Sequence, residues 1–221
     1  MPGNTPSVLL LSLEPPPWPC DLYEELYAAL RTKADVFEAT TSKTALEYLS
    51  SPSHLTAVLV TEVSVMKLKH RAVSTKLVEY TRQGGTVILG CLCSSFSRPS
   101  DINRFFQDTW GLSWRSGSYH RTTFQLNPMA NARFREDRYP SLSKSYSMKA
   151  LHLKDVPVEA QVYVSNANSI IESLVFAPVP VDNRHESPMI LAQFGDGYLG
   201  WVGDVNAEKD STHVVVAMCN L

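Results

Sequence analysis

Residues 72–96 read AVSTKLVEYTRQGGTVILGCLCSSF, and this stretch decides the fold. Apolar residues recur at helical spacing up to Gly84-Gly85, which ends the helix because glycine accepts the positive φ of a C-terminal cap. Residues 86–90 (TVILG) are almost wholly apolar and partly β-branched, the pattern of a strand buried on both faces of a parallel sheet. Thiol and hydroxyl residues follow at 91–95, where an open α/β sheet collects ligands and catalytic groups.

The first ninety residues alternate strand-like and helix-like patterns in the same way. Strands are expected at Ser7–Leu13, Asp35–Thr40 and Leu55–Glu62, and helices at Asp21–Lys33, Ser42–Leu49 and Val63–Gln83. Strands that alternate with helices require right-handed crossovers and form a parallel sheet covered on both faces. We therefore predict an α/β fold, a three-layer sandwich around a mainly parallel, flavodoxin-like central sheet.

The second half of the chain has antiparallel signals. After a helix expected at 101–110, residues 112–126 alternate around Ser116-Gly117-Ser118, which predicts a hairpin. Asp196-Gly197 predicts the turn of a further hairpin within 187–203. Short strands are also expected at 149–154, 160–165 and 170–178. These elements predict antiparallel hairpins added to the parallel sheet.

The end of the chain and the domain organisation follow from the same patterns. Residues 211–221 have an N-cap serine and the length of a closing helix, although three valines leave a strand open. We see no linker between the two halves. We therefore expect one domain over residues 1–221, in which 112–185 is an elaboration rich in hairpins and loops.

The overall composition excludes several classes of function. The chain has 221 residues, 44% of them apolar, and a formal net charge of -2. Its 20 basic residues are scattered, whereas a nucleic-acid binder needs a basic stripe, so we expect no nucleic-acid partner. No apolar run reaches the roughly 18 residues that span a bilayer, and no secretory leader pattern is present. We therefore expect a cytoplasmic protein without a membrane partner.

Cofactor and metal motifs are also missing. No G-x-G-x-x-G opens the first helix and no G-x-x-x-x-G-K-[ST] occurs, so nucleotide binding is unsupported and we expect no cofactor. The four cysteines do not make a disulfide framework in a chain of this length. Cys91-Leu92-Cys93 has no second cysteine pair or histidine pair near it in the sequence, so we expect no metal site.

Three motifs together resemble one known family. They are L-V-E-Y-x-x-x-G-G-T-V-I-L-G at 77–90, G-L-x-W at 111–114 and the hairpin FGDGYLGWVGD at 194–204. This combination resembles the class I glutamine amidotransferase-like superfamily, the flavodoxin-like group that includes the ThuA-like proteins. The resemblance implies that the strand at 86–90 leads to an elbow for a nucleophile. It also implies that the hairpin leads to the position of a catalytic His-x-Glu.

The catalytic Cys-His-Glu pattern of that family is not intact here. The family elbow is G-x-C-x-G, but the matching residues are Gly90-Cys91-Leu92-Cys93-Ser94, and neither cysteine has a glycine two positions later. Where the family has His-x-Glu, this chain has Asn206 and Glu208. Because an amide cannot accept a thiol proton, the resemblance implies that the Cys-His mechanism is lost.

Three functional interpretations remain open. In the favoured one, a non-catalytic amidotransferase-like domain binds a small molecule or a protein partner at the carboxyl ends of the parallel strands. The candidate ligand-binding residues are Glu14, Trp18, Glu62, Ser94, Ser95, Asp204 and Glu208. The alternative is a hydrolase or transferase that uses Cys91 or Cys93, or Ser94, with His120 as the base.

The third interpretation is a structural or assembly domain, with a homodimer as one form. Its candidate interface is the exposed sheet edge or an aromatic ribbon of Trp110, Trp114, Tyr119 and Phe124. Each candidate also has a plainer explanation. Thiols are usually buried, a histidine in a hairpin is usually a surface residue, the aromatic ribbon can pack on the sheet, and an acidic residue before a helix is normal capping chemistry.

Overall fold

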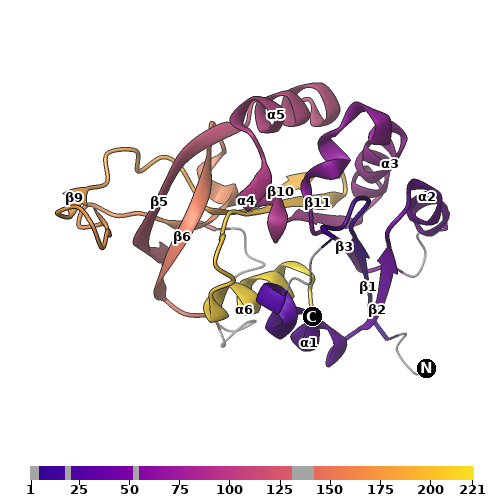
Figure 1. Cartoon of the computed structure of the whole chain (residues 1–221), viewed down its shortest axis with the longest axis horizontal. Coiled ribbons are helices and arrows are strands. Elements are labelled where there is room, and N and C mark those ends of the chain that lie inside the picture. The colour runs from indigo at the N-terminus through magenta and orange to yellow at the C-terminus, as the bar shows by residue number, and fades with distance from the viewer. Residues whose placement is uncertain (1–4, 18–20, 52–54, 131–141) are drawn as a thin grey trace.

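The computed structural model describes residues 5–17, 21–51, 55–130 and 142–221. Within them, nine strands form one sheet in the order β2-β1-β3-β4-β11-β10-β7-β5-β6 (Figure 1). These strands are β1 (Ser7–Leu11), β2 (Asp35–Ala39), β3 (Ala57–Val60), β4 (Thr86–Leu89), β5 (Arg115–Leu126), β6 (Ser145–Lys154), β7 (Gln161–Val164), β10 (Met189–Phe194) and β11 (Gly197–Val202). The helices are α1 (Glu24–Arg31), α2 (Ser42–Ser50), α3 (Arg71–Arg82), α4 (Leu92–Phe96), α5 (Pro99–Arg104) and α6 (Lys209–Met218), with short 3₁₀ or π segments at η1 (Asp21–Tyr23), η3 (Val63–Met66), η4 (Leu68–His70), η5 (Phe105–Trp110) and η7 (Val158–Ala160).

The strands β2, β1, β3, β4 and β11 are parallel, in the flavodoxin-like order with β11 as the fifth strand. Every residue of β1, β3 and β4 is buried, as their continuous apolar sequences predict. The strands from β10 to β6 extend this sheet in antiparallel fashion. The predicted α/β fold, with a parallel N-terminal half and antiparallel strands in the C-terminal half, is confirmed.

Helices cover both faces of the parallel sheet (Figure 1). On one face Leu49 of α2 and Leu77 of α3 share a core with Val58 of β3. On the other face Leu30 of α1 shares a core with Leu59, the next residue of β3, because successive strand side chains point to opposite faces. The α6 helix joins this second core. The closing segment is therefore a helix, as expected, and its valines are packed.

The long helix predicted over Val63–Gln83 is wrong in its first part. The segment folds as η3, η4 and α3, and Lys67 between η3 and η4 has the extended backbone angles φ −81° and ψ 141°. The carboxylate of Glu62 accepts the N–H of Ser64 at 2.7 Å and so starts a separate short turn. The helix ends as predicted, with Gly84 at φ 104°.

The hairpin predicted at 112–126 is also wrong. These residues form the single long strand β5, which pairs with β6, and Gly117 lies in an irregularity of that pairing rather than in a turn. The cause is Glu186, which is far away in the sequence. Its carboxylate accepts the Ser118 N–H at 2.6 Å, and a Cβ on Gly117 would lie 2.6 Å from a Glu186 oxygen. The second predicted hairpin is confirmed as β10 and β11.

A two-stranded arm projects from the antiparallel half, opposite the end that carries β2 (Figure 1). This arm (170–180) contains β8 (Ile170–Ile171) and β9 (Val179–Pro180), which pair only with each other among the described strands. Between them Leu174, Val175 and Phe176 are 106%, 81% and 76% exposed. The described part of the chain has no helix that is long and apolar enough to cross a membrane.

Candidate functional site

A sharp strand-to-helix turn follows β4. Cys91 lies between β4 and α4 with φ 53° and ψ −124°, angles that a residue with a Cβ rarely adopts. The Leu92 N–H donates to the carbonyl of Thr61 at 2.9 Å, and the Cys93 N–H donates to that of Gly90 at 3.0 Å. These bonds fix the turn from both sides. The strained elbow residue is therefore Cys91, whereas the family spacing G-x-C counted from Gly90 would place it at Leu92.

The Cys91 side chain is enclosed. It is 3% exposed, and the cavity beside it has a volume of only about 20 Å³. The Tyr27 hydroxyl lies 4.0 Å from the Cys91 Sγ. The described residues that line this cavity include no histidine; they are Tyr23, Leu26, Leu59, Cys91, Val202, Asp204, Ala207, Glu208, Ser211, Thr212 and Val215. A thiol in this position meets hydroxyls, carboxylates and apolar groups.

The other elbow residues have structural contacts. Cys93 is fully buried in α4, its Sγ lies 3.6 Å from the Val60 carbonyl, and burial raises the pKa of its thiol well above the usual value. The Ser94 hydroxyl is near the carbonyls of Cys91 (3.1 Å) and Asp204 (3.0 Å). Ser95 is exposed on the surface of α4. Ser94 therefore ties the elbow to the loop after β11.

That loop is organised by Asp204. Its two carboxylate oxygens accept the N–H groups of Asn206 at 2.8 Å and Glu208 at 2.7 Å. Burial raises the pKa of the Asp204 carboxyl, and a hydrogen bond from Ser211 opposes that rise. Glu208 forms an ion pair with Arg121 at 2.5 Å. The fold thus brings Cys91, Asp204 and Glu208 to one cavity, but both carboxylates are bound to other groups.

His120 does not line that cavity. Its ring stacks on His152, with 4.4 Å between the centroids. The His152 Nδ1–H donates to the Ser118 carbonyl at 2.7 Å. Burial lowers the pKa of His120, and burial together with His120 lowers that of His152 to about 3. Both Nε2 atoms are buried without a hydrogen-bond partner among the described residues.

Two further candidates lie at the ends of β1 and β3. The Glu62 carboxylate is buried and accepts the N–H of Leu13 at 2.9 Å as well as that of Ser64, so it joins the two strand ends. Glu14 binds Lys67, Lys69 and His70, and hydrogen bonds from these residues hold its pKa well below the usual value. Trp18, also a candidate, lies outside the described residues.

A second cavity opens beside the elbow. This strand-end cavity has a volume of about 240 Å³. It is lined by Leu10, Ser12, Pro15, Pro16, Tyr23, Tyr27, Glu38, Thr40, Thr61 and Leu92. None of the described candidate residues predicted from the sequence lines this cavity. Ser12, Thr40 and Thr61 each directly follow a strand, and this position at a strand's carboxyl end could have indicated them. No group of three or more metal-ligating side chains occurs within the described residues.

Comparisons with known proteins identify the fold. No protein-family model matches the sequence, and a search of curated proteins finds no match. Among solved structures, a ThuA-like protein from Bacteroides uniformis superposes with a TM-score of 0.51 at 8% identity, covering 97% of this chain and 89% of that one. A cytoplasmic protein from Salmonella typhimurium gives 0.53 at 8% identity, with 97% of both chains covered. The chain has a ThuA-like fold.

Larger enzymes contain the same fold as one part. A β-galactosidase from the haloarchaeon Halorubrum lacusprofundi matches with a TM-score of 0.57 at 16% identity, over 97% of this chain and 30% of that one. A β-galactosidase from Bacillus circulans sp. alkalophilus matches with 0.53 at 12% identity, over 98% and 31%. The chain thus spans about a third of these two enzymes. At such low identity, the likeness describes the fold alone.

Proposed function

We propose that this chain is a non-catalytic amidotransferase-like domain that binds a small molecule in the strand-end cavity. One observation carries the first half of the proposal. Cys91 occupies a strained elbow of the kind that presents a nucleophile, yet its cavity is about 20 Å³ and no described histidine lines it. On this proposal the turn is present without the histidine that thiol catalysis would need.

The chemistry of the neighbouring groups supports the loss of catalysis. A general base must lie within about 3 Å of the thiol or reach it through one water. Asp204 is the acidic group of this cavity that lies deepest, but both of its oxygens accept backbone N–H groups. His120 is held in the stack with His152. Cys93 has a raised pKa, which keeps its thiol protonated at neutral pH.

The strand-end cavity supports the binding half of the proposal. It opens where the strands of an α/β sheet present their ligands. Hydroxyls of Ser12, Tyr27, Thr40 and Thr61 line it. Its volume of about 240 Å³ lies below the roughly 300–1,000 Å³ of drug-sized sites, so the ligand is small. Hydroxyl groups both donate and accept hydrogen bonds, and they suit a polyol or a small amide.

Thiol reactivity tests the loss of catalysis. The folded protein is treated with iodoacetamide across neutral pH, and the labelled cysteine is identified by mass spectrometry. We expect Cys91 and Cys93 to remain unlabelled until the protein unfolds, because both are buried. Rapid labelling of Cys91 with an apparent pKa well below about 8.5 would instead support a thiol enzyme.

Ligand-observed NMR with erythritol and glycerol tests the binding half. We expect saturation transfer to these polyols with the unmodified protein. Ser12→Trp fills the strand-end cavity and should abolish the signal, whereas Ser95→Trp, on the exposed surface of α4, should preserve it. Equal signals from the two variants would remove the strand-end cavity as the binding site.

Assembly with a protein partner is a second candidate function, and the arm favours it. Three consecutive apolar side chains at its tip are almost fully exposed, and contiguous exposed apolar surface marks contact sites. The aromatic ribbon does not supply such a surface. Trp110, Trp114 and Phe124 are buried, whereas Tyr119 is exposed and lies under the Lys149 ammonium at 5.2 Å.

A further inference from the structure

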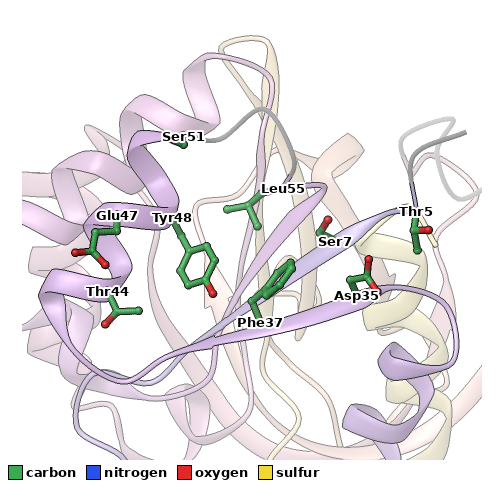
Figure 2. A pocket seen from close by; sticks show the side chains of 9 residues that line it. All are labelled: Thr5, Ser7, Asp35, Phe37, Thr44, Glu47, Tyr48, Ser51 and Leu55. Atoms are coloured by element: carbon green, nitrogen blue, oxygen red, sulfur yellow. The ribbon is translucent and has the colours of Figure 1, made fainter.

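A third cavity lies away from the elbow. This edge groove has a volume of about 720 Å³. Asp35 begins β2, Ser7 begins β1, and Leu55 precedes β3, so the groove lies at the amino ends of the parallel strands. Side chains of α2 form its other wall (Figure 2). It is lined by Thr5, Ser7, Asp35, Phe37, Thr44, Glu47, Tyr48, Ser51 and Leu55. The strand-end cavity shares none of these residues.

The middle of the edge groove is aromatic. The rings of Phe37 and Tyr48 lie 5.5 Å apart at an interplanar angle of 34°. Phe37 remains 38% exposed because β2 is the edge strand and no described strand pairs with its outer side. Leu55 lies beside the two rings (Figure 2). Accessible aromatic faces of this kind attract apolar groups and, through the ring quadrupole, cations.

The charged side chains described in the edge groove are both acidic. The described lining residues include Asp35 and Glu47 but no lysine, arginine or histidine. Neither carboxylate forms a hydrogen bond or an ion pair with a described side chain. Glu38 on the same strand shows the contrast, since it pairs with Arg31 at 3.2 Å. Figure 2 shows Glu47 and Asp35 on opposite sides of the two rings.

We propose that the edge groove binds a linear aliphatic diamine or polyamine. One ammonium group would meet Asp35 and another Glu47, while the methylene chain crosses Phe37, Tyr48 and Leu55. A cavity of about 720 Å³ is of the size that holds a small molecule. A monoamine leaves one carboxylate without a partner, and a neutral diol leaves both. The groove therefore selects for two positive charges joined by an apolar chain. This inference is independent of the function proposed for the strand-end cavity.

Isothermal titration with spermidine and cadaverine tests the inference. We expect binding with one site per chain and an affinity at least about tenfold higher than that of pentylamine, with no binding of 1,5-pentanediol. The affinity should fall when salt is raised to about 150 mM, because the groove is open and its charges are screened. Pentylamine binding as tightly as cadaverine would overturn the two-charge model.

Variants locate the site. Asp35→Asn and Glu47→Gln should each weaken spermidine binding by about three- to tenfold, and Tyr48→Leu should weaken it as well. The matched control is Glu79→Gln, which removes one exposed negative charge on α3, outside the edge groove. Equal weakening by Glu79→Gln would indicate unspecific attraction and overturn the proposal, as would unchanged binding to the Asp35→Asn/Glu47→Gln double variant. Urea midpoints equal to wild type show that the variants are folded.

Discussion

The strained backbone at Cys91 predicts that glycine at this position gives a more stable protein than alanine, the reverse of the usual order within a helix. A Cβ at φ 53° and ψ −124° costs about 1–3 kcal/mol, and Cys91→Gly removes that cost, whereas Cys91→Ala keeps it. Both variants lose the buried sulfur, which contributes about 1 kcal/mol. We therefore expect Cys91→Ala to be destabilised by about 1 kcal/mol, and Cys91→Gly to equal or exceed wild type by up to about 2 kcal/mol.

Cys93 supplies the matched control two residues later. It lies within α4 with ordinary helical geometry and is equally buried. At such a position glycine is less favourable than alanine by about 1 kcal/mol. Cys93→Gly should thus be less stable than Cys93→Ala, the reverse of the order at Cys91. The difference in unfolding free energy between the glycine and the alanine variant should therefore have opposite signs at Cys91 and Cys93.

Urea unfolding of the four variants, followed by far-UV circular dichroism, measures these differences. Free energies come from linear extrapolation, and the slope should be the same for all four variants. The reasoning is refuted if Cys91→Gly is less stable than Cys91→Ala by the same amount as at Cys93. That result would mean that Cys91 has an unstrained backbone and that no nucleophile-type elbow exists.

Two further predictions concern the buried histidines and the arm. Because His152 is kept neutral by burial, with its pKa lowered to about 3 against about 6.5 in an unfolded chain, unfolding takes up a proton below pH 6.5. The free energy of unfolding should fall by about 1.4 kcal/mol per pH unit from pH 6.5 down towards pH 3. Urea unfolding of His152→Asn should show a smaller dependence on pH in this range. An equal pH dependence in the variant and the wild type would contradict the prediction. Replacing Leu174, Val175 and Phe176 by serine should change the unfolding free energy by no more than about 0.5 kcal/mol from that of the wild type and should lower the binding of a hydrophobic dye. A large loss of stability would show that these side chains are packed against other residues.

The fold could be predicted where local sequence determines structure. The apolar run of β4 and Gly84 at the end of α3 act through their own backbone preferences, so pattern alone locates them. The errors at Gly117 and at residue 63 have different causes, one distant in the sequence and one local. Gly117 lies in a strand because Glu186 binds the next N–H. The helix expected from residue 63 is interrupted after the buried carboxylate of Glu62 caps a short turn.

The candidate site could be predicted in part. Cys91, Asp204 and Glu208 come from the ends of strands that neighbour each other, and they do share a cavity. The sequence does not show which histidine reaches this cavity, and the strand pairing of β5 puts His120 against His152 instead. Tyr27 could not be predicted, because a helical pattern does not say which residues reach past the helix to the strand ends.

The position of β11 determines when the sheet can close. This strand lies between β4 and β10, and its Tyr198 is opposite Thr86, more than a hundred residues earlier in the chain. Closing a loop of that length costs roughly 4 kcal/mol in chain entropy, and this cost precedes the contacts that offset it. Until β11 arrives, β4 has an open edge onto which another chain can add. We propose that the nine-stranded sheet forms slowly and as one cooperative unit, so that circular dichroism and tryptophan fluorescence should report the same unfolding transition.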